Sequence, residues 1–298
     1  MSRPVTMALC ALALGSGQLA VGAQPNPSEF VGKAIGEDEV RATFDAQPLL
    51  QAFDFSFLSS DHHLQRVSVI PDPQRNKVRI RYSDKNRDDA FKWSASFVQL
   101  DDPRIVRGSI SREARSKGFR VHDLPRPRGN FVFALVGFSL SYTVGDHHID
   151  KIGIYEKAGE LTVVMNDKNN DDPFYYTINY AYLPGDLVQL TDRVSGRARG
   201  QDFEETSLGI PVLSGFLFDY SSKDHQLRRM AVEPRNGSVQ VAYHDKNSDD
   251  KFSWSVDVTI LKDTATPTKL STSTIAPIGP HATTIRGARR RSFTRAGN

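Results

Sequence analysis

The stretch that decides the fold runs from Phe53 to Leu100 and has the sequence FDFSFLSSDHHLQRVSVIPDPQRNKVRIRYSDKNRDDAFKWSASFVQL. It recurs twice, as VGFSLSYTVGDHHIDKIGIYEKAGELTVVMNDKNNDDPFYYTINYAYL from residue 136 to 183 and as SGFLFDYSSKDHQLRRMAVEPRNGSVQVAYHDKNSDDKFSWSVDVTIL from residue 214 to 261. Internal similarity at a regular spacing is the sequence signature of repeat architectures. We therefore predict three tandem copies of one unit.

Apolar and polar residues alternate along most of each copy. Phe53, Phe55 and Phe57 are separated by single polar residues, and Val78 and Ile80 repeat the pattern downstream. Alternation over four to eight positions rich in β-branched and aromatic residues is typical of half-buried strands. Four such strands per copy, with two weaker ones upstream, predict an all-β fold. We expect three tandem antiparallel β-sandwich repeat units of about six strands each.

The first residues are typical of an export signal. An apolar stretch at 5–19 follows the positive charge of Arg3, and residues 21–23 are small, as a signal peptidase site requires. We expect removal of residues 1–23 and a secreted or periplasmic mature protein. No later stretch has the roughly 20 apolar residues of a membrane helix, so no transmembrane segment is predicted. The only cysteine, Cys10, lies in the signal, so the mature chain would have neither a disulfide nor a catalytic thiol.

The last residues differ in composition from the rest. Residues 264–298 are rich in Thr, Ser and Pro and contain six basic residues and no acidic one, which predicts a disordered tail. Subtracting these six charges and that of Arg3 from the net charge of +3 leaves −4 for the body, so we predict no nucleic-acid binding by the fold. The predicted organisation is a signal peptide at 1–23, β-sandwich repeats at 28–101, 102–185 and 186–263, and the tail at 264–298.

Two polar signatures recur at fixed places in each copy. A DHH-type sequence follows the first strong strand, and a DKN-type sequence precedes the last one. In an antiparallel unit these two loops leave the sheet at the same end, so we expect their side chains to converge. The residues of the first signature are Asp61, His62 and His63, then Asp146, His147 and His148, then Asp224 and His225, with Gln226 replacing the second histidine. Those of the second are Asp84, Asn86 and Asp88, then Asp167, Asn169 and Asp171, then Asp245, Asn247 and Asp249.

Three interpretations of these loops stay open. Oxygen ligands at alternate positions of a tight loop suit Ca²⁺, with the Asp and Asn residues as metal ligands and the histidines as ligand-binding groups. A complete EF-hand is excluded, because Asp89 stands where glycine is usual and Ala95 where the twelfth, acidic residue belongs. A softer transition metal would favour the imidazoles. Alternatively, Asp and Asn simply favour turns, and the loops are structural.

Aromatic residues of the last strand could form a platform for stacking a sugar. Trp93 and Trp254 alternate in step with the phenylalanines two residues earlier, and Tyr176 is their equivalent in the second copy. Residues in step share one face of a strand, so we expect these rings in the core. Tyr175 is expected to point outward.

The strand motifs resemble those of the H-type lectin domain. An FxF strand, a VxV strand, a VxVxY strand and a closing FxWxV strand occur in a six-strand unit, mainly within 53–100 and its two copies. The resemblance implies an extracellular sandwich that binds sugars as a trimer, which three units in one chain could imitate. The DHH and DKN signatures do not correspond to sugar-binding residues of that family.

We predict a secreted multivalent binding protein, most plausibly lectin-like or adhesive, with repeated, Ca²⁺-dependent loop sites. The expected partner is an extracellular glycan or surface polymer. One alternative is a structural or interaction module of an extracellular assembly without a ligand site, and another is a secreted hydrolase, since acid and histidine clusters can catalyse hydrolysis. Three near-equivalent copies, without GxSxG, HExxH or a phosphate-cradling glycine loop, argue against an enzyme.

Overall fold

The computed structural model describes residues 26–59, 63–86, 89–114, 119–143, 147–167, 172–220, 226–246 and 250–262. The predicted signal peptide and the predicted tail lie outside these ranges. The described residues belong to one compact unit. We refer to residues 28–101, 102–185 and 186–263 as segments 1, 2 and 3.

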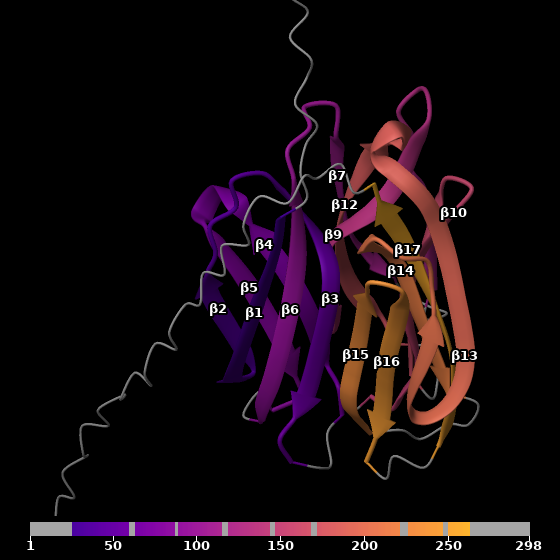
Figure 1. The fold of residues 1–298 in the computed structure, drawn as a ribbon. Helices are drawn as coiled ribbons and strands as arrows, with labels where there is room; N and C mark the ends of the chain where they lie inside the picture. The colour runs from indigo at the N-terminus through magenta and orange to yellow at the C-terminus, as the bar shows by residue number, and fades with distance from the viewer. Residues whose placement is uncertain are drawn as a thin grey trace, which may run out of the picture. The chain divides into compact units, whose positions relative to one another are not determined.

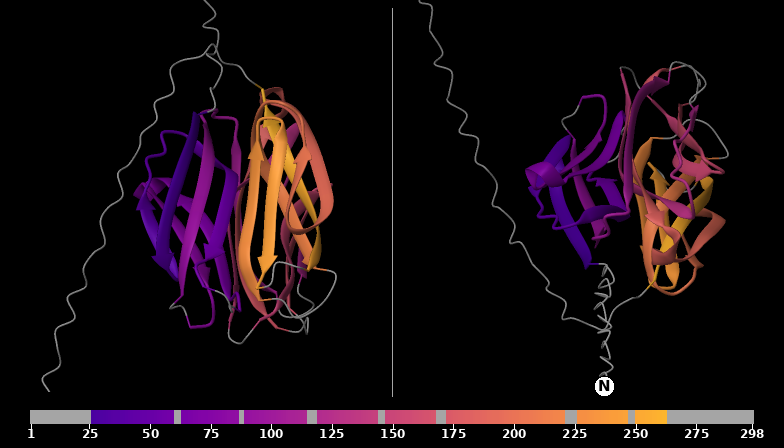
Figure 2. Two further views of the ribbon diagram at one scale, coloured as in Figure 1. Left: turned by 60° about the horizontal axis from the view of Figure 1, so that its bottom comes forward. Right: turned by 90° about the horizontal axis from the view of Figure 1, so that it is seen from above.

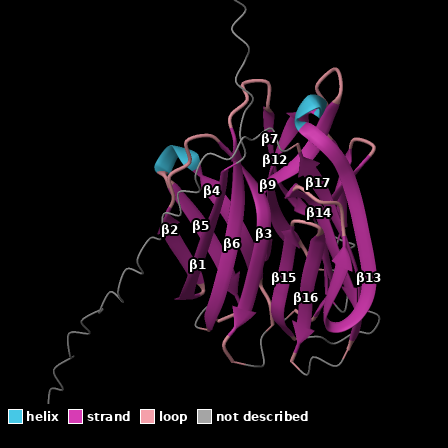
Figure 3. Cartoon of the chain, in the orientation of Figure 1, coloured by secondary structure: helices cyan, strands magenta, loops and turns pink. Residues whose placement is uncertain are grey.

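The described residues form antiparallel strands, which confirms the all-β prediction. They include no α-helix, only two short 3-10 turns at Pro73–Arg75 and Gly185–Leu187 (Figure 3). Within these ranges, no helix has the length and apolar character that crossing a bilayer requires. The strands are β1 (Asn26–Ile35), β2 (Glu37–Arg41), β3 (Gln47–Phe57), β4 (Arg66–Asp72), β5 (Lys77–Ser83), β6 (Ala90–Leu100), β7 (Val106–Ala114), β8 (Phe119–Asp123), β9 (Phe131–Tyr142), β10 (Ile149–Lys157), β11 (Glu160–Asp167), β12 (Phe174–Pro184), β13 (Val188–Glu205), β14 (Ile210–Tyr220), β15 (Leu227–Arg235), β16 (Ser238–Asp245) and β17 (Lys251–Leu261).

Within each segment the strands pair in the same order. In segment 1, β6 pairs with β1 and β3, and β5 pairs with β2 and β4. In segment 2, β12 pairs with β7 and β9, and β11 pairs with β8 and β10. In segment 3, β17 pairs with β13 and β14, and β16 pairs with β13 and β15. Each segment thus contributes two rows of three strands, as in a β-sandwich.

One long strand, β13, serves both rows of segment 3. Its residues from Val188 to Arg199 pair with β17, and those from Gly200 to Glu205 pair with β16. Gly200 has a φ of +71° at this change of partner, in the region that favours glycine. In segment 1 two separate strands, β1 and β2, meet at Gly36, which has a φ of +66°. A glycine bend therefore carries the chain from one row to the other in both segments.

Each segment also pairs with both of the others. β3 pairs with β15, β9 with β4, and β14 with β10, so the three junctions form a closed cycle. In Figure 1, β3 and β15 lie side by side. The right view of Figure 2 shows the indigo, magenta and orange-to-yellow strands around a common centre.

Three phenylalanines, one from each segment, fill this centre. Phe53, Phe138 and Phe216 are fully or almost fully buried. The ring centroids are 5.3 Å apart for Phe53 and Phe138, 5.2 Å for Phe53 and Phe216, and 5.3 Å for Phe138 and Phe216. The buried apolar cluster that contains them draws residues from all three segments. The segments therefore share one core.

A basic residue crosses each junction, with a different partner each time. Arg229 on β15 donates to both carboxylate oxygens of Asp54 on β3, at 3.0 and 2.9 Å. The corresponding contacts are Arg66 Nε to Ser141 Oγ at 3.2 Å and Lys151 Nζ to Asp219 Oδ2 at 2.7 Å. The cycle is therefore similar in backbone pairing but not in side-chain chemistry.

Candidate functional site

The two polar signatures meet in segment 2, around His147. This histidine is 1 % exposed, and its ring stacks on that of Tyr142 with a centroid distance of 3.7 Å. Its Nδ1 atom lies 3.1 Å from Asp167 Oδ2 and 3.4 Å from Asp172 Oδ2. A residue that follows β9 thus contacts both sides of the loop between β11 and β12, as antiparallel pairing of these strands requires.

This cluster has a geometry that two chemistries can use. The three atoms, Nδ1 of His147 and one oxygen each of Asp167 and Asp172, all lie within 4.8 Å of one another. An imidazole N–H can donate to Asp167 at 3.1 Å without any ion. Alternatively, tetrahedral Zn²⁺ holds N and O ligands at about 2.0–2.2 Å, which places ligand atoms roughly 3.4 Å apart. Ca²⁺ takes about six to eight oxygen ligands, so an imidazole in the set favours the softer ion.

The surroundings of His147 are rich in negative charge. The pKa of the Tyr142 hydroxyl is raised well above its usual range, mainly by burial and further by the carboxylates of Asp167, Asp172 and Asp150. The hydroxyl donates to the carbonyl of Met165 at 2.8 Å and stays neutral. A cation between the loops would therefore be electrostatically favoured.

The first aspartate of the DKN signature is buried in all three segments, at Asp84, Asp167 and Asp245. In segment 1 its Oδ1 accepts a hydrogen bond from the backbone N–H of Asn86 at 3.1 Å. An aspartate that bonds the backbone two residues ahead stabilises a turn by itself. This residue therefore has a structural role in segment 1, whatever else the loop binds.

The second histidines of the DHH signature, His63 and His148, contact each other across the boundary between segments 1 and 2. The rings of His63 and His148 lie edge to face with centroids 4.4 Å apart. Gln226, which takes this position in segment 3, places its Nε2 3.4 Å from Nε2 of His63. The three segments thus bring equivalent side chains together at one end of the shared core. The two histidines of segment 2 therefore have different partners: His147 contacts the aspartates of its own segment, and His148 contacts His63 of segment 1.

Several predicted site residues lie outside the described ranges. They are Asp61, His62, Asp88, Asp146, Asn169, Asp171, Asp224, His225, Asn247 and Asp249. The described members of the predicted site are His63, His147, His148, Asp84, Asn86, Asp167 and Asp245.

The aromatic residues of the closing strands lie where their alternation predicts. Trp93, Trp254 and Tyr176 are buried, whereas Tyr175 is 51 % exposed, which confirms the expected sides of the strand. A sugar-stacking role for the two tryptophans is therefore excluded by burial.

Polar partners of these buried rings were not predicted. Trp93 Nε1 donates to Asp38 at 2.9 Å, and Trp254 Nε1 donates to Asp202 at 2.8 Å. Both aspartates follow a glycine bend in a Gly-x-Asp sequence, at 36–38 and 200–202, and this shared triplet was the signal that could have revealed them. In segment 2 the corresponding contact joins His122 to the hydroxyl of Tyr176.

Stability should fall on acidification because of His122. Burial lowers the pKa of this imidazole, and the positive charges of Arg120 and Arg112 lower it further. Since the folded-state pKa is below the unfolded value of 6.5, protonation favours the unfolded chain, and stability present above that pH is lost as pH falls through and below it. We expect the melting temperature to drop between pH 7.5 and about pH 5.5, and the drop to be smaller in His122→Gln. His281→Gln, in the tail, is the control; identical pH profiles for His122→Gln and the unsubstituted chain would contradict the assignment.

In comparisons with known proteins, no protein-family model and no curated protein matches the chain. The contacts of the loop end itself are one histidine held by two carboxylates, and three side chains from three segments that meet at one end of the shared core.

Proposed function

We propose that the chain is an exported multivalent binding protein, that its three segments are copies of one lectin-like β-sandwich unit, and that its ligand is a glycan. The observation that carries the proposal is the closed cycle of strand pairing around Phe53, Phe138 and Phe216. His63 contacts both His148 and Gln226, so the described ends of the three loops lie close together, which supports a common loop end. Equivalent loops are thereby presented together to one surface.

Such an arrangement suits a repetitive ligand. Weak sites that are held together at fixed spacing bind a repeated epitope with an avidity that can exceed the single-site affinity by about 10²–10⁴. A glycan chain or a glycan-coated surface repeats its epitope in this way. The six-strand units and the grouping of three are also what the resemblance to H-type lectins implies.

We propose further that a divalent cation joins the two loops of segment 2. His147, Asp167 and Asp172 would hold it, and the negative surroundings of Tyr142 support a positive charge there. The imidazole favours Zn²⁺ over the Ca²⁺ that the oxygen-rich sequence suggests. The ion would fix the loops in the conformation that contacts the ligand.

Added Zn²⁺ should raise the melting temperature if this ion binds. A ligand at a hundredfold excess over its Kd stabilises the folded state by about 2.7 kcal/mol, and a domain of this size gains about 2–4 °C per kcal/mol. We expect a shift of several degrees with Zn²⁺, a smaller one with Ca²⁺, and loss of both in EDTA. His147→Gln and Asp167→Asn should abolish the shift, whereas Asp186→Asn, an exposed partner of Arg104, should keep it. Equal melting curves with the ion and with EDTA would refute the cation site, and the cluster would then serve only as a hydrogen bond between His147 and Asp167.

A glycan array tests the proposed function directly. The mature protein is applied with Zn²⁺, with Ca²⁺ and with EDTA, and the array carries each glycan at high and low density. Binding that increases steeply with glycan density supports a multivalent lectin. Absence of binding under all three conditions would refute it.

A structural module is the second candidate, and the turn made by Asp84 and Asn86 favours it. If the loops only join strands, Asp84→Asn should destabilise the fold without changing binding to any surface. Assembly with other extracellular proteins would then be the function to seek, and pull-down from the extracellular fraction with an equally stable control variant would test it.

A further inference from the structure

A polar groove lies on the outer face of the strands that join segments 1 and 2, away from the core. It has a volume of about 390 Å³ and is lined by residues of β4, β5, β9 and β12. The residues that matter here are Ser68, Arg79, Arg81, Ser139, Thr177 and Asn179. The groove thus crosses a junction between two segments, and neither segment forms it alone.

Small hydrogen-bonding side chains form the floor of the groove. Thr177 is directly opposite Ser139 in the strand register, Ser139 is opposite Ser68, and Ser68 is opposite Arg81. Consecutive hydroxyl groups therefore run across three strands and end at a guanidinium. Next to this row, the side chain of Asn179 accepts a hydrogen bond from the hydroxyl of Ser109 at 2.7 Å, which leaves its amide N–H groups directed to other acceptors.

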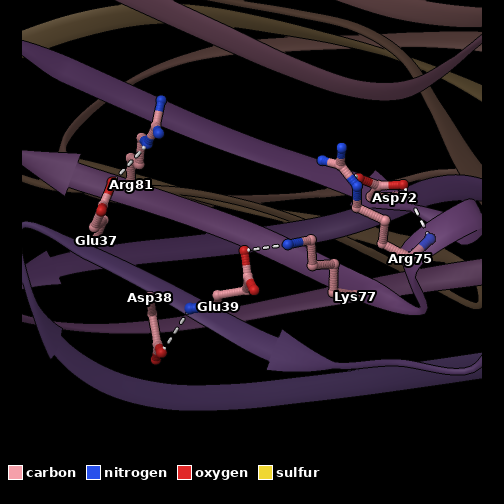
Figure 4. A network of polar contacts seen from close by, with 7 residues as sticks. All are labelled: Glu37, Asp38, Glu39, Asp72, Arg75, Lys77 and Arg81. Atoms are coloured by element: carbon pink, nitrogen blue, oxygen red, sulfur yellow. Dashed lines mark hydrogen bonds and ion pairs between the residues drawn. The ribbon is translucent and has the colours of Figure 1, made fainter.

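The charges on the groove wall do not balance. β5 presents Lys77, Arg79 and Arg81 on this face, and the neighbouring β2 presents Glu37, Glu39 and Arg41. Figure 4 shows Arg81 bonded to Glu37, at 2.9 Å, and Lys77 bonded to Glu39, at 2.8 Å. Both carboxylates are therefore used by Arg81 and Lys77, and the positive charges on these two strands outnumber them.

Two arginines line the groove, and Arg79 is the one that is not bonded to these glutamates. Its Nε atom is buried and has no hydrogen-bond partner among the described residues. Leaving a buried donor of a charged group unsatisfied is unfavourable. Because Arg79 also lines the groove, an acceptor supplied from outside could bind the part of its guanidinium that faces the groove. A guanidinium presents a planar fork of donors that matches a carboxylate in shape and charge.

The pair of arginines on β5 occurs at only one of the three junctions. Aligning the VxVxY-type strands places Gln240 and Thr162 at the position of Arg79, and Ala242 and Val164 at the position of Arg81. The other two outer faces therefore lack arginines at these two positions, and the arginine that lines the groove at the junction of β3 and β15, Arg229, is bonded to Asp54. Strand pairing does not require an arginine at this position, because β16, with Gln240, and β11, with Thr162, form the same pairing without one.

We propose that this groove binds an acidic saccharide, with one uronate carboxylate on Arg79 and sugar hydroxyls on Ser68, Ser139, Thr177 and Asn179. Within the groove only Arg79, of the two lining arginines, is not bonded to Glu37 or Glu39, and one guanidinium fits one carboxylate better than a doubly charged phosphate or a densely sulfated chain. The proposal deepens the proposed function by naming the class of glycan, and it rests on that function; the site itself is separate from the loop end.

The test compares two probes on three proteins. The probes are a uronate-containing tetrasaccharide and its carboxyl-reduced, neutral form, titrated by calorimetry at low salt. The proteins are the unsubstituted chain, Arg79→Gln, which installs the residue found at the equivalent place in segment 3, and Arg75→Gln, which removes an exposed arginine outside the groove. We expect Arg79→Gln to raise the Kd for the acidic probe at least tenfold, since charge-assisted hydrogen bonds typically contribute that much. Arg75→Gln should change it less than twofold.

Two further results decide the proposal. The neutral probe should bind the unsubstituted chain about as weakly as the acidic probe binds Arg79→Gln, and added salt should weaken only the acidic interaction. Thr177→Val, on a different strand, should weaken the binding of both probes. This variant replaces Arg79→Gln as the test of the groove if Arg79→Gln has a lowered melting temperature. Equal Kd values for the two probes, or for Arg79→Gln and the unsubstituted chain, would overturn the acidic-saccharide site. If the protein fails this test but binds neutral glycans on the array, the proposed glycan-binding function stands without the acidic-saccharide site. If it binds no saccharide of either kind, both the site and the proposed function are refuted.

Discussion

Replacing Phe138 by alanine is expected to lower the free energy of unfolding by about 3–5 kcal/mol, the usual range for a fully buried phenylalanine. The ring is fully buried and contacts Phe53 and Phe216 at centroid distances of 5.3 Å each. Its removal leaves a cavity at the point where all three segments meet. Backbone pairing on every side of that point limits how far the neighbours can move to fill it. Guanidinium-induced unfolding followed by tryptophan fluorescence and far-UV circular dichroism would measure the loss.

The matched control is Phe203→Ala, because Phe203 is 58 % exposed on β13. An exposed substitution of this kind usually stays within about 0.5 kcal/mol. Since the segments share one core, both probes should report one transition in the unsubstituted chain. A loss below about 1 kcal/mol in Phe138→Ala, or separate transitions for the three segments, would contradict the shared core.

Gly153→Ala is expected to destabilise the chain by about 1–3 kcal/mol, although alanine usually favours a strand over glycine. A Cβ at this position would lie 2.5 Å from the carbonyl oxygen of Phe216 and 2.8 Å from Cα of Leu217. Both are backbone atoms of β14, which pairs with β10 at this register. Relief therefore requires the two segments to move apart. The melting temperature and the denaturant midpoint would record the effect.

The other two junctions provide the comparison. Ser68 on β4 and Ala231 on β15 occupy the position equivalent to Gly153, and both carry a Cβ. Ala231→Gly should lower stability by roughly 0.5–1 kcal/mol, through the added freedom of the unfolded chain. If Gly153→Ala proved neutral or stabilising, the close approach of β10 to β14 would not be a constraint.

Much of the strand structure could be predicted because a strand has a period of two. Alternation at Phe53, Phe55 and Phe57 placed one side of β3 in the core, and all three rings are buried. The same period separated Tyr176 from Tyr175, since neighbours in a strand point to opposite faces. The local pattern was sufficient to predict which of these side chains are buried, because the buried face of a strand depends on the alternation within that strand alone.

The partners of each strand could not be predicted in this way. β3 pairs with β15, more than 170 residues away, and nothing in the alternation of either strand specifies the other. For the same reason the separation of His147 from His148 could not be foreseen, because it depends on which segment lies next to the loop. Arg79 was equally hidden, since its missing partner becomes apparent only when β2 is placed beside β5 and both glutamates are found to be bonded elsewhere.

The closed cycle of junctions has a consequence for how such a molecule can change over time. Three separate but identical chains in a ring would carry the same residue at every corner, and their ring would come apart on dilution. A single chain keeps its ring at any concentration, and each corner can mutate alone. The chain already differs from corner to corner: Arg229 meets Asp54 at one, Lys151 meets Asp219 at another, and Arg66 meets a serine at the third. Covalent connection thus allows three junctions with similar backbone pairing to acquire three different sets of side chains.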